Sequence, residues 1–247
     1  MGAYGIAEIL QIYDTTHTKA DGDGDGPKAG QIVRTVVPQY GDRWRIFDAV
    51  RSDSANHTSV SGTLRDAQEA DFKPKQRLPI KLVSLGDCEE LLALKAKLRP
   101  CVVLAVSPGV APHTISDVSQ RNVAQNVLRP ACLVAPAFTV AIPGETKPFG
   151  PIMSARVQCM VYPEFVWLPA SGGVIKYDSV VRLDRAFWST LPPPTVMEPL
   201  SLHQEMLAVI DNQLAVLRGL DPSAEYKSAV SLLQEQLPQF AMPRAPN

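Results

Sequence analysis

Three short runs of apolar and β-branched residues constrain this chain more than any other feature. They lie at residues 30–37, 99–106 and 131–136, and glycine or proline borders or interrupts each run. Runs of this length predict β-strands. The continuous apolar character of 99–106 predicts a strand that is buried on both faces, and 131–136 is also expected to be a buried strand. Two amphipathic helical patterns follow near the C-terminus. The sequence therefore predicts a mainly β fold of the α+β class, with a small barrel or strongly bent sheet and C-terminal helices packed on it.

The same reading of apolar spacing and turn residues predicts the remaining elements. Further strands are expected at 44–47, 154–168 and 174–183. Helices are expected at 87–97, at 114–128, from an N-cap at Ser201 to Gly219, and from Pro222 to about residue 237. The polar residues 51–63 are expected to form a loop.

The 247 residues are enough for one domain with a large insertion. Residues 1–29 are expected to be a flexible leader, since the alternating Asp and Gly of 21–26 lack the distant glutamate of a calcium-binding loop. Residues 30–220 would form the barrel domain, with an insertion at about 38–98. Residues 221–247 would form the last helix and a tail.

Charge and cysteine content point to no particular ligand. Lys and Arg number 24 against 25 Asp and Glu, so the chain is not a basic protein overall, although a local basic patch is compatible with that balance. The four cysteines have neither CxxC nor zinc-site spacing and are expected to be buried, reduced thiols. No signal peptide or membrane-spanning run is recognised, so a cytoplasmic protein is expected. Neither a metal nor a cofactor is expected, since the histidines and cysteines lack metal-site spacing and no glycine loop for a phosphate is present.

The segment from Ser179 to Arg185 carries the most informative polar pair. Residues two apart on a strand share a face, so Arg182 and Asp184 are expected on the same side, with Cα atoms roughly 6.6 Å apart. Such a pair suits RNA cleavage without a metal: the carboxylate accepts the proton of the ribose 2′-hydroxyl, and the guanidinium stabilises the phosphorane charge. The alternative is a surface salt bridge, which the spacing alone favours because such pairs are common.

Four segments, in this order, resemble the MazF/PemK family of bacterial mRNA-cleaving toxins. They are the opening strand Gly30-Gln31-Ile32-Val33, the arginine–proline strand from Leu98 to Leu104, the weaker match from Val134 to Thr139, and the segment from Ser179 to Asp184. The resemblance implies an SH3-like, PemK-like β-barrel and a homodimer that cuts single-stranded RNA to a 2′,3′-cyclic phosphate. It also implies an antitoxin protein as a partner.

The resemblance assigns roles to individual residues. Arg182 matches the family's catalytic arginine and Asp184 its catalytic acid, while Arg99 and Thr139 match residues that complete the catalytic site. Phe138 and Lys97 lie beside these positions and are expected to contact the RNA.

Several departures from the family pattern favour a second hypothesis. Phe138 stands where a hydroxyl residue is usual, Gln31 replaces an acidic residue, and the long insertion replaces a short loop. The alternative is therefore a PemK-like module without nuclease activity, whose insertion binds a protein partner.

Overall fold

The computed structural model describes the chain in segments. The described residues are 5–14, 26–39, 43–50, 60–73, 85, 88–109, 129–140 and 149–242. The chain divides into two compact units, unit 1 from Met1–Val36 with Leu98–Asn247 and unit 2 from Val37–Lys97. The insertion expected at about 38–98 spans nearly the same residues as unit 2. The helix expected at 114–128 lies outside the described residues.

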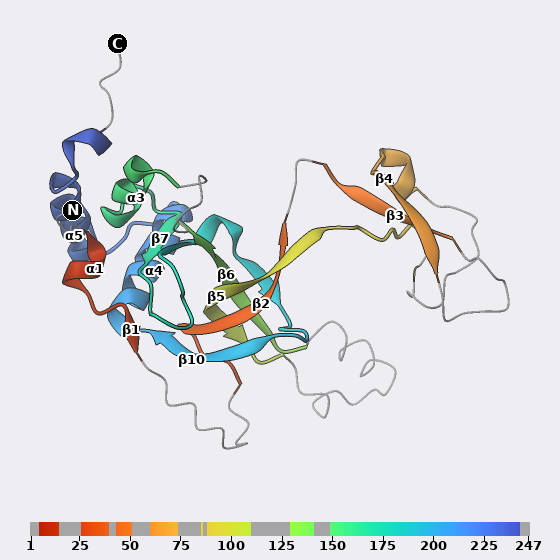
Figure 1. Cartoon of the computed structure of the whole chain (residues 1–247), viewed down its shortest axis with the longest axis horizontal. Coiled ribbons are helices and arrows are strands. Elements are labelled where there is room, and N and C mark those ends of the chain that lie inside the picture. The colour runs from red at the N-terminus through yellow and green to blue at the C-terminus, as the bar shows by residue number, and fades with distance from the viewer. Residues whose placement is uncertain are drawn as a thin grey trace, which may run out of the picture. The chain divides into compact units, whose positions relative to one another are not determined.

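Unit 1 is built on one curled sheet that forms half a barrel (Figure 1). Its strand order is β1-β10-β2-β5-β6-β8-β7, and β9 also pairs with β6. The strands are β1 Tyr13–Asp14, β2 Gln31–Gln39, β5 Lys95–Ser107, β6 Ala131–Thr139, β7 Phe165–Leu168, β8 Ser179–Arg182, β9 Phe187–Ser189 and β10 Val196–Leu202. Together with the helices, this sheet confirms the predicted mainly β, α+β class.

The three apolar runs form strands, as predicted, and they lie next to one another in this sheet. They become β2, β5 and β6, and neighbouring residues in each strand are buried although they point to opposite faces. The fully buried pairs are Ile32 and Val33, Val102 and Val103, and Val134 and Ala135. Burial on both faces explains why these runs lack the apolar–polar alternation of a strand with one solvated face.

Four helices gather at one side of the sheet (Figure 1). They are the single-turn α1 Ile6–Ile9, α3 Pro151–Gln158, α4 Gln204–Leu217 and α5 Ala224–Glu235. The predicted start of α4 at Ser201 is wrong, because Ser201 belongs to β10 and lies opposite Gln31 of β2. His203 is the N-cap instead, and its imidazole accepts a hydrogen bond from the Glu205 amide.

The beginning of α5 and the C-terminal tail also differ from expectation. Ser223, one residue after the expected Pro222, caps the helix through a hydrogen bond from the Tyr226 amide to its hydroxyl. Beyond α5, the tail is ordered at Gln239–Ala241, a 3-10 turn whose Ala241 is fully buried. Arg156 of α3 donates a 2.7 Å hydrogen bond to the Ala241 carbonyl, which fixes the tail on α3.

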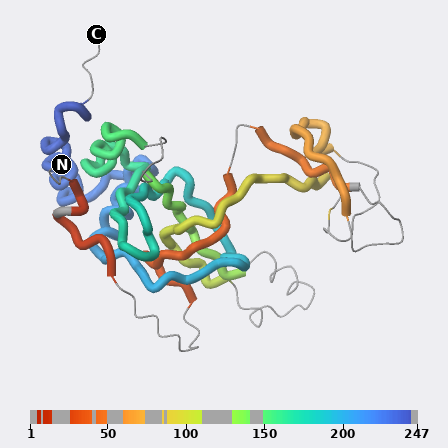
Figure 2. The backbone as a smooth tube through the Cα atoms, viewed as in Figure 1, coloured from red at the N-terminus to blue at the C-terminus, as the bar shows by residue number. Residues whose placement is uncertain are grey.

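The expectation that residues 1–29 form a flexible leader is wrong for the stretch from Gly5 to Asp14. Ile6 and Ile12 are buried in the main core. Tyr13 pairs with Leu202 of β10, and its hydroxyl donates to the Pro169 carbonyl over 2.6 Å. Figure 2 follows this red segment alongside the blue C-terminal helices.

The strand predicted at 154–168 is a helix in its first half. Gly150, with φ +74°, and Pro151 start α3, and only Phe165–Leu168 is a strand. Ala155, Val157 and Cys159 alternate with the polar residues Arg156 and Gln158 in the sequence. That alternation gives a period-2 signal, but Ala155 and Val157 are buried from a helix.

The strand predicted at 174–183 shrinks to Ser179–Arg182. Residues before it close a loop, in which the backbone amide of Ser171 donates to the Ile175 carbonyl over 2.8 Å and the Ile175 amide donates to the Ser171 hydroxyl over 3.1 Å. Ile175 is buried, so the apolar residues of this stretch serve the core without extending the strand.

Unit 2 contains a hairpin of β3 Arg45–Val50 and β4 Ser61–Asp66, followed by the 3-10 turn Glu69–Phe72. The loop expected at 51–63 is therefore wrong at residues 61–63. The helix expected at 87–97 is wrong over residues 88–97. Residues 91–93 lie extended along β3, with hydrogen bonds from the Phe47 amide to Leu91 and from the Ala93 amide to Arg45, and β5 starts at Lys95.

Candidate functional site

Arg182 and Asp184 form the ion pair that the sequence predicts, but by a different backbone route. β8 ends at Arg182, and Asp184 lies in the 3-10 turn Leu183–Arg185. The turn is held by the Leu183 amide, which donates to the Glu164 carbonyl over 2.9 Å, and by the Ala186 amide, which donates to the Leu183 carbonyl over 3.2 Å. The expectation that both residues lie on one straight strand is therefore wrong for Asp184.

The pair is bidentate. The Arg182 Nε donates to Asp184 Oδ1 over 2.7 Å, and Arg182 Nη2 donates to Asp184 Oδ2. The two side chains are 29% and 34% exposed, so solvent and a ligand reach both. A planar fork bound to both carboxylate oxygens holds the orientation of the two groups more strictly than a single contact.

The electrostatics keep Asp184 ionised. The hydrogen bond from Arg182 is the main cause that lowers the pKa of Asp184, and the positive charges of Arg182 and Arg185 add to it, while partial burial opposes it. The Arg185 Nε lies 3.8 Å from Asp184 Oδ2. The same hydrogen bond raises the pKa of Arg182. At neutral pH the site therefore presents a carboxylate held between two guanidinium groups.

Arg182 keeps donors for another acceptor. A guanidinium has five N–H groups, and Asp184 receives bonds from Nε and Nη2. The Arg182 guanidinium carbon also lies 5.0 Å from the centre of the Phe165 ring on β7, which supports the cation from one side. The sequence gives no sign of the role of Phe165, because the pairing of β7 with β8 that brings it opposite Arg182 is not a local signal.

A second arginine is held on an aromatic ring. The guanidinium carbon of Arg99 lies 4.5 Å from the centre of the Phe138 ring. Burial lowers the pKa of Arg99, and its Nε atom is buried without a hydrogen-bond partner among the described residues. Phe138, which departs from the family pattern, therefore acts as the platform for Arg99.

Strand register places the two arginines on one face. Cys101 lies opposite Pro136, so continuing this register by two residues brings Arg99 opposite Phe138. Phe138 lies opposite Val180 of β8, and Arg182 is two residues further along that strand. Two strand spacings and one two-residue step separate the Cα atoms of Arg99 and Arg182 by about 12 Å. We call Arg99, Phe138, Arg182 and Asp184 the two-arginine site.

The other two predicted residues, Thr139 and Lys97, lie on β6 and β5 next to residues of this site. Thr139 lies opposite Ser179, next to Phe138 along β6, so its side chain is on the other face of the strand. The strand register therefore does not place Thr139 on the same face as Arg99. Lys97 is exposed and lies two residues before Arg99 on β5, which places both side chains on the same face of that strand, and its contact with RNA stays a prediction.

The cysteines are all free, and Cys101, Cys132 and Cys159 are buried as expected, whereas Cys88 is exposed. Among the described residues, no three His, Cys, Asp or Glu side chains are grouped so as to hold a metal ion. In the same part of the chain no helix combines the length and apolar character needed to cross a bilayer. Comparison of the chain with protein-family models, with curated proteins and with solved structures gave no significant match.

Proposed function

We propose that this protein is a metal-independent endoribonuclease that cleaves single-stranded RNA and leaves a 2′,3′-cyclic phosphate. The observation that carries the proposal is the bidentate Arg182–Asp184 pair on the face that also presents Arg99. This arrangement combines the ionised carboxylate of Asp184 with the positive charges of Arg182 and Arg99, and Arg182 keeps N–H groups that Asp184 does not use. RNA cleavage by attack of the ribose 2′-hydroxyl on the adjacent phosphate requires such groups: a base for the hydroxyl proton and positive charge for the phosphate.

Binding would begin with the phosphate. The N–H groups of Arg182 that Asp184 does not use would donate to the non-bridging phosphate oxygens, and the charge of Arg99 would add a longer-range attraction. A base beside the phosphate would stack on the Arg99 and Phe138 pair, since guanidinium planes and aromatic rings both stack on bases.

The chemical step uses Asp184 as the base. Asp184 accepts the proton of the 2′-hydroxyl, the 2′ oxygen forms a bond to phosphorus, and the bond from phosphorus to the 5′ oxygen breaks. The protonated Asp184 then returns its proton to the 5′ oxygen. Because its lowered pKa makes Asp184 a weak base, charge stabilisation by Arg182 and Arg99 would supply most of the rate acceleration.

The same proposal covers the type of fold and the biological setting. The four segments that resemble the MazF/PemK family form β2, β5, β6 and β8 of a single sheet, which supports a PemK-like barrel. We accordingly propose a cytoplasmic homodimer that acts as the toxin of a toxin–antitoxin system.

The test is RNA cleavage in EDTA by the wild-type protein, Arg182→Ala and Asp184→Ala. Matched controls are Arg218→Ala and Asp211→Ala, which remove an exposed arginine and an exposed aspartate of the α4 region. Cleavage by wild type and controls, with cyclic-phosphate ends and at least a hundredfold loss in both site variants, is the expected result. Intact RNA in every lane, with all proteins folded by circular dichroism, would exclude the nuclease.

A second candidate function is a binding module, and one feature of unit 2 favours it. Trp44, Phe72 and Leu92 are 51%, 50% and 43% exposed and line a hollow of about 460 Å³. The 3-10 turn that carries Phe72 is held in place, because Arg65 donates two 2.7 Å hydrogen bonds to the buried Asp71. Exposed apolar side chains on a rigid support are typical of protein-binding surfaces.

The cleavage assay separates the two functions. If RNA stays intact with folded protein, the double variant Trp44→Ala and Phe72→Ala becomes the informative one in partner-binding assays. If cleavage depends on Arg182 and Asp184 and is unchanged in the double variant, the hollow is dispensable for the reaction.

A further inference from the structure

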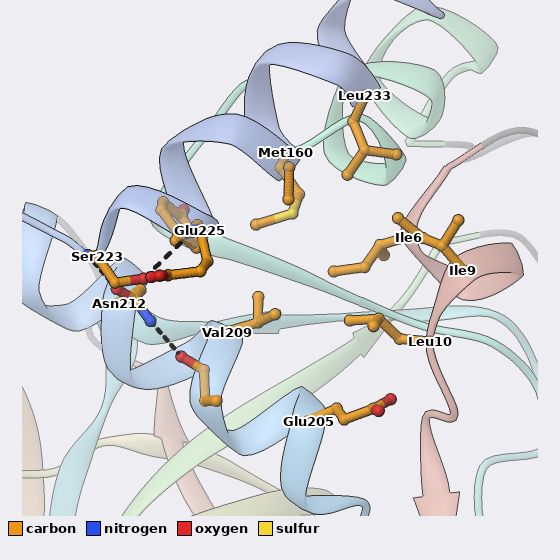
Figure 3. Close-up of a pocket in the computed structure, with 13 residues that line it drawn as sticks. Ile6, Ile9, Leu10, Met160, Glu205, Val209, Asn212, Ser223, Glu225 and Leu233 are labelled. Atoms are coloured by element: carbon orange, nitrogen blue, oxygen red, sulfur yellow. Dashed lines mark hydrogen bonds between the residues drawn. The ribbon is translucent and has the colours of Figure 1, made fainter.

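A separate pocket of about 270 Å³ lies between the N-terminal segment and the C-terminal helices (Figure 3). Ile6 and Leu10 form one wall, Val209 of α4 forms another, and Leu233 of α5 forms a third. The pocket shares no lining residue with the two-arginine site. Its volume lies just below the roughly 300–1,000 Å³ of sites for drug-sized molecules, so it suits a fragment-sized ligand.

Two carboxylates line this largely apolar pocket. Glu205 lies in the first turn of α4 and Glu225 in the first turn of α5, and Figure 3 draws them apart on different edges of the pocket. In the described part of the chain, the His203 Nδ1 atom lies 3.7 Å from the Glu205 carboxylate but accepts a hydrogen bond from the Glu205 backbone amide, and Glu225 forms no ion pair. First-turn glutamates also stabilise their own helices, but that role leaves their outer oxygens available.

Of the neutral polar residues that line the pocket, Asn212 and Ser223 have hydrogen-bond partners within the chain, and Tyr226 adds an aromatic ring with a hydroxyl group. The Asn212 amide donates to the Ala208 carbonyl and accepts from the Ser223 amide, each over 2.8 Å. The recognition chemistry that remains is an apolar surface flanked by negative charge. An anionic ligand would meet repulsion from both carboxylates, whereas a cation with an apolar body would satisfy both features.

We propose that this pocket binds a small molecule with an apolar, ring-sized body and one protonated amine. The apolar body fills the space lined by Ile6, Val209 and Leu233, and the ammonium group lies toward Glu205 or Glu225. The proposal is independent of RNA cleavage, since it uses none of the residues of the two-arginine site.

Three probes with the same indole body test it: tryptamine, indole and indole-3-acetate, titrated against the full chain by NMR. We expect tryptamine to bind about threefold to tenfold more tightly than indole, and indole-3-acetate to bind more weakly than either. The preference for the amine shrinks at high salt, because exposed charges are screened.

Variants test whether the two glutamates cause the preference for the amine and whether the probes bind in this pocket. Glu205→Gln with Glu225→Gln removes the preference for the amine and leaves indole binding unchanged, whereas the exposed control Glu235→Gln changes neither. Ala229→Trp fills the pocket and abolishes binding of all three probes. Ala208→Leu fills it from α4 and serves where Ala229→Trp fails to fold.

Three outcomes overturn the proposal. One is the absence of binding by tryptamine and indole, and another is an amine preference that survives the double glutamine variant. The third is a change in self-association by sedimentation in Ala229→Trp together with no charge preference among the probes, which assigns the pocket to a second copy of the chain.

Discussion

The guanidinium carbon of Arg99 on β5 lies 4.5 Å from the centre of the Phe138 ring on the neighbouring strand β6. The two residues form a cationic and aromatic surface on the face of the sheet that carries Arg182. Phe138 stands where the MazF/PemK pattern has a hydroxyl residue. Its ring instead supports the guanidinium of Arg99, which faces the same side of the sheet as Arg182.

Phe138→Leu should weaken binding of single-stranded RNA by roughly fivefold to tenfold, because it removes a stacking surface and the support of Arg99. Fluorescence anisotropy with a labelled oligonucleotide at fixed salt measures the change. Phe240→Leu is the control, since Phe240 is 55% exposed on the C-terminal 3-10 turn. Equal affinity of Phe138→Leu and wild type would remove Phe138 from the site.

Asp184→Asn should lower stability at neutral pH and have little effect in strong acid. The pKa of Asp184 is lower in the folded chain than in the unfolded chain, so the pair stabilises the fold above the unfolded pKa. That contribution is lost as the pH falls through the folded pKa. Urea midpoints between pH 7 and about pH 2 measure it, with Asp211→Asn as the control. A difference that is constant over this range would contradict the assignment.

Gly30→Ala should destabilise the protein by about 1–3 kcal/mol. Gly30 has φ +85°, a conformation that residues with a Cβ rarely adopt, and an added Cβ would lie 2.9 Å from Leu207 Cδ1. Its amide and carbonyl also join β5 to β10 through 2.8 Å hydrogen bonds with Val103 and Leu202. Gly173→Ala is the matched control for thermal or urea unfolding, since no atom lies within 4 Å of its added Cβ.

Ile6→Ala should cost about 2–4 kcal/mol of unfolding free energy, because Ile6 is 2% exposed in the main core. Ile9→Ala, at a residue of the same helix that is 59% exposed, should change it by less than about 0.5 kcal/mol. Urea unfolding of both variants measures the difference. Equal stability of the two variants would show that the N-terminal segment does not contribute to the core.

The sequence missed several elements whose backbone hydrogen bonds are made with distant partners. Val196–Leu202 has no strong strand pattern, yet it lies between β1 and β2 in the sheet. Residues 91–93 carry a helical pattern, yet their amides and carbonyls bond to β3. Local propensity is a weak term, and pairing with an existing strand edge overrides it.

The candidate site likewise has one pair of residues that the sequence predicts and one pair that only strand pairing brings together. Arg182 and Asp184 are close in sequence, so a two-residue spacing was enough to predict that they meet, although a turn and not a strand brings them together. Arg99 and Phe138 are 39 positions apart, and only the register of β5 with β6 pairs them. The same register turns Thr139 to the other face, because a shift of one residue reverses the direction of a strand side chain.

The sequence by itself determined the class of the fold and its buried centre, because continuous apolar runs can be stable only where both faces of a strand are covered. It also determined the Arg182–Asp184 pair, which short-range spacing brings within reach. Only the tertiary structure decided which residues join that pair and that the N-terminal segment closes a pocket against α4 and α5. Those contacts depend on strand register and helix packing between distant segments, and no local pattern of residues encodes either.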